Sequence, residues 1–204
     1  MTGARRMPFV LLAALASAAC TSATVHLYTL VPTSETSPAA IGSQPRQRIV
    51  FESVSLPSDI DRKELVIRKS PHELALLENA NWASPLREEV RRGLTIDLHR
   101  ALQDGAKAVP IAAVSPTVIR VDVHEWEATA SAVRLSAEWR MYRTDSTDPI
   151  DVRCEIDLLE RTSGSVDDLV RADQALLENI AMSIARVLHG DHCHEVARAR
   201  SSGW

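Results

Sequence analysis

The chain has 204 residues, 45% of them hydrophobic and 25% charged, which is ordinary for a globular protein with one sizeable core. Its formal net charge is −4, from 23 basic and 27 acidic side chains. This balance argues against a nucleic-acid-binding protein, which normally presents a basic face.

The first nineteen residues predict a lipoprotein signal peptide. A short basic segment ending at Arg6 precedes an apolar run over residues 7–16, which has signal-peptide length and is too short to span a bilayer. Small residues then lead to Cys20, as in the bacterial lipobox, whose cysteine is acylated and becomes the new N-terminus. We therefore expect lipid attachment at Cys20 and a short tether over residues 20–23. The alternative is a plain secretory signal in which this cysteine is incidental.

The residue after the cysteine bears on the membrane involved. Aspartate at that position retains lipoproteins of enteric bacteria in the inner membrane, whereas this chain has Thr21. By that analogy we expect an anchor in the outer membrane with the protein on the periplasmic face. Several acyl chains on one cysteine would make this anchoring stable.

Strands are predicted both before and after a central helix. The expected segments are 24–30, 48–56, 65–67, 117–126, 132–142 and 152–158. The last three alternate apolar and charged residues strictly, which is typical of an antiparallel meander with one packed and one solvated face.

Two amphipathic helices are predicted. The first begins at Ser84-Pro85, because serine accepts hydrogen bonds from first-turn amides and proline loses nothing at the first helical position. The second begins near Ser165, ends at Gly190 and has the broadest apolar stripe in the chain. We expect an α/β single domain over residues 24–190, with both helices packed on a mixed, largely antiparallel sheet, and a flexible tail over residues 191–204.

A histidine-rich segment follows the last helix and reads His189-Gly-Asp-His-Cys-His194. Imidazole and thiolate groups are the usual ligands of zinc and copper. The segment has no second spaced pair of ligands, so a solvated tail is the preferred interpretation. The less favoured metal candidates are His189, His192, Cys193 and His194.

Two cysteines remain once Cys20 is acylated. In an oxidising compartment Cys154 and Cys193 could form a disulfide. Because Cys154 points to the expected core face of its strand, it could equally be a buried free thiol.

Two carboxylates lie near the apolar stripes of the helices, Asp97 in the first helix and Asp173 in the second. A buried carboxylate is costly unless it is paired, so each could mark a functional site. The preferred interpretation is that each meets an arginine or a backbone amide at the rim of the core. The sequence has no nucleophile elbow, Walker loop or dinucleotide-binding motif, and it predicts neither an enzyme nor a cofactor.

The stretch from the end of the second predicted strand to the start of the first predicted helix resembles a known family. It reads Leu56-Pro57-Ser-Asp-Ile-Asp61-Arg62, then Leu65-Val-Ile-Arg68, then Trp82-Ala-Ser-Pro85-Leu86-Arg87 at the start of a helix. This is similar to the ABC-type transport auxiliary lipoproteins of the paraquat-inducible protein C type. In that family an LPxYLDRPQIVTR block precedes RWAEPL and a helix.

The resemblance implies a non-catalytic outer-membrane lipoprotein with an α/β fold. It implies partners, namely a periplasmic mammalian-cell-entry (MCE) domain protein and inner-membrane transporter components, in lipid movement or envelope integrity. It also allows a ring-shaped homo-oligomer. The competing function is a stand-alone periplasmic lipoprotein that binds a metal or small ligand through the histidine-rich segment.

We expect the partner contact on the polar edge that follows Pro57, because proline-fixed backbone presents charge there. The residues are Asp59, Asp61, Arg62 and Arg68. The alternative is that Asp61 and Arg62 form a local ion pair with only a structural role.

Overall fold

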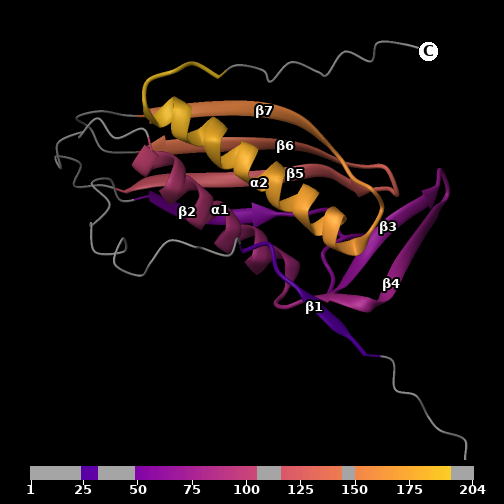
Figure 1. Cartoon of the computed structure of the whole chain (residues 1–204). Coiled ribbons are helices and arrows are strands. Elements are labelled where there is room, and N and C mark those ends of the chain that lie inside the picture. The colour runs from indigo at the N-terminus through magenta and orange to yellow at the C-terminus, as the bar shows by residue number, and fades with distance from the viewer. Residues whose placement is uncertain (1–23, 32–48, 105–115, 144–149, 194–204) are drawn as a thin grey trace, which may run out of the picture.

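Figure 1 shows the computed structural model, which describes residues 24–31, 49–104, 116–143 and 150–193. The mixed α/β class with two principal helices is confirmed. In chain order the elements are β1 (His26–Tyr28), β2 (Ile49–Ser55), β3 (Glu64–Ser70), β4 (Glu73–Trp82), α1 (Leu86–Asp104), β5 (Thr117–Ala128), β6 (Ala132–Arg143), β7 (Ile150–Arg161) and α2 (Val166–Leu188). No helix in the described part of the chain combines the length and hydrophobicity needed to cross a membrane.

The described strands form two sheets where the sequence suggested one. The larger sheet has the order β2-β5-β6-β7, and the smaller has the order β1-β4-β3. Neighbouring strands are antiparallel except that β2 runs parallel to β5 and β1 runs parallel to β4. The sequence did not predict β4, because Glu73–Trp82 has no β-branched residue and lacks regular alternation. Its pairing with β3 creates the second sheet.

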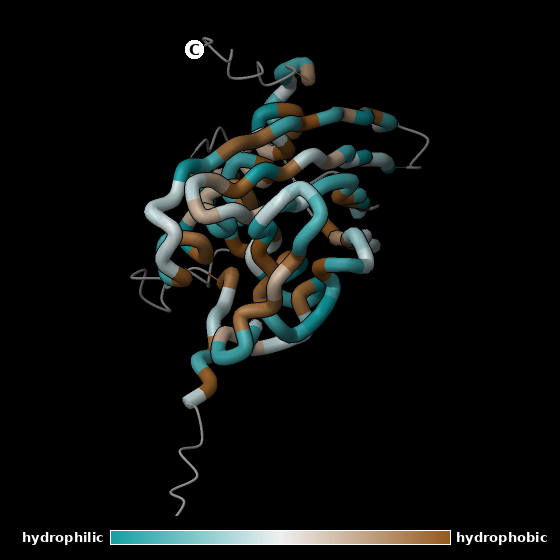
Figure 2. Tube along the Cα trace, turned by 90° about the vertical axis from the view of Figure 1, so that its right-hand side faces the viewer, coloured by the Kyte–Doolittle hydropathy of each residue, from teal (hydrophilic) through white to brown (hydrophobic). Residues whose placement is uncertain are grey.

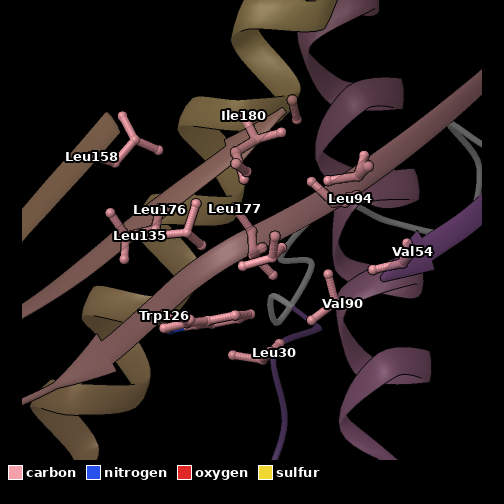
Figure 3. Packing of buried hydrophobic residues seen from close by; sticks show 14 of the residues in the cluster. Leu30, Val54, Val90, Leu94, Trp126, Leu135, Leu158, Leu176, Leu177 and Ile180 are labelled. Atoms are coloured by element: carbon pink, nitrogen blue, oxygen red, sulfur yellow. The ribbon is translucent and has the colours of Figure 1, made fainter. Parts of the chain in front are cut away.

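The core lies between the four-stranded sheet and the helices. Both helices cover the same face of this sheet (Figure 1) and contact each other. Figure 3 shows Leu135 and Leu158 of the sheet facing Leu176 and Ile180 of α2, with Leu94 of α1 beside them. Each fully buried leucine or isoleucine stabilises the fold by about 1.5–3 kcal/mol through apolar burial.

The other face of the four-stranded sheet is polar, as the strict alternation predicted. Arg140 donates to both carboxylate oxygens of Asp151, at 2.9 and 2.8 Å, across β6 and β7. Arg153 lies 3.3 Å from Glu138 on the same pair of strands. Cross-strand ion pairs therefore stabilise this face.

The helix ends follow from local sequence. The Ser165 hydroxyl accepts from the Asp168 amide at 3.1 Å, which is the predicted N-cap of α2, and Gly190 at φ 98° follows its C-cap. Helix α1 begins at Leu86, slightly later than expected, and the Ser84 hydroxyl accepts from the Arg92 guanidinium at 2.5 Å.

Candidate partner-contact site

A groove separates the β3–β4 hairpin from the end of β5. Its volume is about 150 Å³. The residues that line it, which we call the hairpin groove, are Pro57, Asp59, Ile60, Val66, Arg68, Leu74 and the run from His124 to Ala128. In Figure 1 the hairpin projects beyond the ends of β5 and β6.

Both walls of the hairpin groove come from strand edges. Strand β3 is the last strand of its sheet, and among the described residues no strand pairs with its outer edge. The β2 ladder on β5 ends where Ser55 pairs with Asp122, because Pro57 cannot donate to a ladder. The remainder of β5 therefore continues along the groove without β2 beside it.

The structure places Arg68 and Asp59 in the hairpin groove. The Arg68 guanidinium forms an ion pair with Glu127 of β5, and it also donates to the Pro71 carbonyl at 3.3 Å. Arg68 thus joins the hairpin to the four-stranded sheet. Asp59 is exposed at the groove mouth.

Asp61 and Arg62 lie on an adjoining hollow beside Trp82 and the start of α1. Arg87 donates to the Asp61 carboxylate at 2.5 Å, while Arg62 lies 3.7 Å from Glu64. In the structure Asp61 therefore pairs with Arg87 and Arg62 lies near Glu64, so each has a partner other than its neighbour. The backbone amides of Ile60 and Asp61 both donate to the Pro57 carbonyl, at 3.2 and 3.1 Å, which fixes this loop.

The charge in the hairpin groove is mainly negative. Asp59, Glu125 and Glu127 face one guanidinium, that of Arg68, which is already paired. A partner that supplies cationic side chains is therefore electrostatically complementary to this surface.

Sequence reasoning missed the role of Glu89. Its fully buried carboxylate accepts from the Thr29 hydroxyl at 2.6 Å, from the Leu30 amide at 3.1 Å and from Arg92 at 2.6 Å. Helix α1 therefore holds the segment that follows β1. The spacing of Glu89 from Leu86, within the apolar stripe of α1, is the signal that could have revealed it.

The buried Asp173 has a different partner from the one expected. Its carboxylate accepts from the Trp126 indole at 2.8 Å, not from an arginine or a backbone amide. Burial raises the pKa of Asp173 to about 7, and the Trp126 hydrogen bond opposes part of this rise. The carboxylate borders a hollow of about 30 Å³ with otherwise apolar walls, which has room for little more than water.

Asp97 lies next to the expected type of partner. Arg100 donates to it at 3.2 Å, one turn along α1. Burial raises the pKa of Asp97 to about 6, while Arg100 lowers it and Glu178 raises it further. The arginine thus offsets part of the burial cost.

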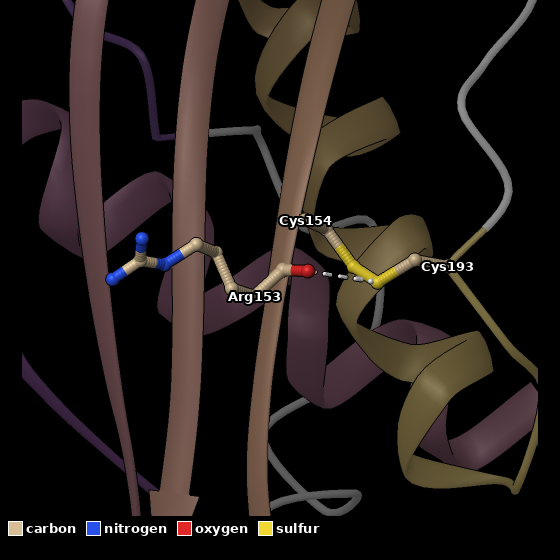
Figure 4. Close-up of a disulfide and its surroundings, with 3 residues drawn as sticks. All are labelled: Arg153, Cys154 and Cys193. Carbon is tan, nitrogen blue, oxygen red and sulfur yellow. Dashed lines mark hydrogen bonds between the residues drawn. A yellow bond between two sulfur atoms is a disulfide. The ribbon is translucent and has the colours of Figure 1, made fainter.

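Figure 4 shows Cys154 and Cys193 joined by a disulfide, the pairing that the sequence left open. Their Cα atoms are 5.8 Å apart, within the usual range for a bridge. The bond ties β7 to the segment after α2, and the Cys193 sulfur lies 3.5 Å from the Arg153 carbonyl. A bonded Cys193 has no thiolate to offer a metal.

The predicted metal ligands lie near the C-terminal end of the chain, and the predicted signal peptide and lipid anchor lie at its N-terminal end. Among the described residues there is no group of three or more His, Cys, Asp or Glu side chains that could hold a metal. His189 is the C-cap of α2, and His194 lies outside the described residues. The signal peptide over residues 1–19, Cys20 and its tether also lie outside them.

The disulfide gives a direct prediction. Alkylation of the unreduced, unfolded mature protein is expected to modify neither Cys154 nor Cys193, and reduction is expected to expose two alkylatable thiols. Mass spectrometry counts them. A Cys193→Ser variant serves as the control, because it should show one thiol without reduction. Two modified thiols in the unreduced wild-type protein would rule the bridge out.

Comparison with known proteins gives a family match and similar solved structures. A family model described as ABC-type transport auxiliary lipoprotein component matches residues 28–185. A crystal structure of an uncharacterized protein superposes with a TM-score of 0.59 at 20% identity, covering 81% of this chain and 99% of that one.

Protein XCC0632 from Xanthomonas campestris superposes with a TM-score of 0.54 at 16% identity, covering 78% of this chain and 92% of that one. At these identities the two structures are evidence for the fold alone. No curated protein matches the sequence.

Proposed function

The chain belongs to the family of ABC-type transport auxiliary lipoprotein components, and on that premise we propose that it is a non-catalytic subunit of an MCE-type intermembrane lipid transport system. In this proposal Cys20 anchors it in the outer membrane and the domain faces the periplasm. The observation that carries the proposal is the family match over residues 28–185, which spans nearly all of the described strands and helices.

The buried carboxylates support an adaptor over an enzyme. Asp173 borders an apolar hollow of about 30 Å³, which is too small for an organic substrate. Asp97 lies beside Arg100 on the same helix. Both carboxylates thus have partners that account for their burial without substrate chemistry.

The hairpin groove is the surface that we assign to the periplasmic MCE-domain partner. Its carboxylates at Asp59 and Glu125 remain exposed, and two strand edges border it. Side chains paired within the protein, such as Arg68, keep the walls of the groove in place for docking. A ring-shaped homo-oligomer would present several such grooves around one axis to the partner and, through it, to the inner-membrane transporter.

Charge reversal in the hairpin groove tests the partner contact. The double variant Asp59→Lys with Glu125→Lys is expected to reduce the MCE-domain protein recovered by cell crosslinking about tenfold, because two unfavourable charge contacts together exceed about 1.4 kcal/mol. The matched control is Glu155→Lys with Asp157→Lys on β7, which should leave recovery unchanged. Equal recovery from both double variants, or a failure to recover any MCE-domain protein with the wild type, would contradict the assignment.

The anchor has a separate test. A Cys20→Ala variant is expected to move from the membrane pellet to the soluble fraction after ultracentrifugation, since no acyl chain could be attached. Its Cys154–Cys193 bridge reports whether the variant still folds. A folded variant that stays in the pellet would refute lipid anchoring at this residue.

A further inference from the structure

Two large apolar side chains are exposed on β1 and directly before it. Leu27 is 68% exposed, the highest value among the exposed large hydrophobic residues of the described chain, and Val25 is 49% exposed. Residues two apart in extended chain point to the same side, so these two side chains share a face. The segment then leads into the protein, where Tyr28 is half-buried and Leu30 is fully buried.

This apolar face lies at one extremity of the molecule. In Figure 1 β1 projects from the body, and the first described residues lie at its outer end. Figure 2 shows hydrophobic residues at that end. β1 pairs with β4 on one side, and in the part of the chain that the structure describes no strand pairs with its other side.

The covalent chain keeps this extremity close to the lipid attachment site. Cys20 precedes Thr24 by four residues, which span at most about 14 Å, and it precedes Leu27 by seven residues, which span at most about 25 Å. In the proposed function the acylated end of the chain lies at the bilayer surface. Of all the described strands, β1 is the one that this tether holds nearest to the membrane.

We propose that Val25 and Leu27 form a second contact with the bilayer that carries the Cys20 anchor. The inference rests on the proposed function, since it requires the anchor. Apolar side chains gain free energy when they enter the boundary between headgroups and acyl chains. Two side chains would bind too weakly on their own, but the short tether makes their contact intramolecular and raises their effective concentration.

The contact would orient the whole domain because the segment after β1 is held firmly. Glu89 of α1 accepts from Thr29 and Leu30, and Gln174 of α2 donates to the Thr29 carbonyl at 3.1 Å. A side chain at Gly93 would meet the Leu30 carbonyl at 3.1 Å, so the helix approaches this segment closely. The membrane contact therefore sets the direction in which the helices and the hairpin groove point.

Fluorescence quenching of the lipidated full chain tests this inference. The protein, purified from membranes, is reconstituted in vesicles of phosphatidylethanolamine and phosphatidylglycerol. One fluorophore is attached at Leu27→Cys or, as the matched control, at Leu74→Cys, which is 42% exposed on the projecting hairpin. The bridged and acylated cysteines do not react. We expect lipids carrying a quencher near the headgroup to quench the first site at least about twofold more than the second, and soluble acrylamide to do the reverse.

The outcomes separate the contact from the anchor. Equal quenching at both sites in vesicles that carry the protein on flotation would overturn the contact and leave the anchor standing. Protection of Leu27→Cys from acrylamide without quenching by lipid would assign the face to a protein neighbour and also overturn it. Protein that does not float with the vesicles would overturn both proposals.

A second variant excludes an effect of the label itself. Val25→Ser with Leu27→Ser, labelled at His26→Cys, is expected to lose the lipid quenching that His26→Cys shows alone. Persistence of that quenching in the serine variant would overturn the contact.

Discussion

Replacing Glu89 by alanine is expected to lower the free energy of unfolding by about 2–4 kcal/mol and to release the segment that follows β1. The carboxylate is fully buried and accepts hydrogen bonds from Thr29, Leu30 and Arg92. Alanine leaves the Leu30 amide buried without an acceptor, and an unsatisfied buried donor costs about 1–3 kcal/mol by itself. Urea unfolding measures the loss, and hydrogen exchange of the Leu30 amide reports the release.

Glu88 provides a matched control for this prediction. It is the same residue type in the same first turn of α1, but its side chain is exposed and pairs with Arg91 at 2.7 Å. Exposed ion pairs contribute little, so Glu88→Ala should unfold close to the wild type and keep the Leu30 amide protected. Equal destabilisation by the two substitutions would show that only helix-dipole compensation is at stake, and not the hold on the N-terminal segment.

The segments with regular patterning were predictable from sequence. The charged alternation of β5, β6 and β7 and the broad stripe of α2 each identify one buried face, because the spacing of apolar residues must match the period of the element. Strand β4 lacks such a signal. Its sequence alternates poorly, and its side chains stay largely exposed where the hairpin projects from the body.

The division into two sheets depends on pairings that local patterns do not encode. β2 pairs with β5 across the intervening β3, β4 and α1, and β1 pairs with β4 across the intervening β2 and β3. Both are parallel pairs, which need long connections. Tertiary packing decides which strands pair. Prediction from one segment at a time therefore gave one sheet instead of two.

In the candidate site, too, local sequence did not reveal which residues pair with each other. The polar loop after Pro57 was expected at the surface, and Asp59 is exposed there. The partners of its neighbours come from remote positions, with Arg87 lying 26 residues beyond Asp61 and Glu127 lying 59 residues beyond Arg68. Asp59 and Arg62 lie at the surface as expected, but sequence did not show that Asp61 and Arg68 are half-buried in ion pairs with distant elements.

The wild type is expected to lose stability as the pH rises. Asp173→Asn is expected to remove most of that loss. Burial raises the pKa of Asp173 to about 7 from an ordinary 3.8. Between about pH 4 and pH 7 the unfolded chain is ionised at this residue while the folded chain keeps its proton. The folded state then binds more protons, so raising the pH favours unfolding, by about 3 kcal/mol between about pH 5 and pH 8.

Asparagine isolates this effect because its carbonyl can still accept from the Trp126 indole. The free energy of unfolding of the variant, relative to that of the wild type, should increase by about 3 kcal/mol between about pH 5 and about pH 8, measured by urea unfolding at both values. Asp97, with a pKa raised to about 6, is present in both proteins and cancels in the comparison. Asp173→Leu should be less stable than the asparagine variant at both pH values, because it leaves the Trp126 donor buried and unpaired. A difference between wild type and asparagine variant that does not change with pH would contradict titration of this buried carboxylate.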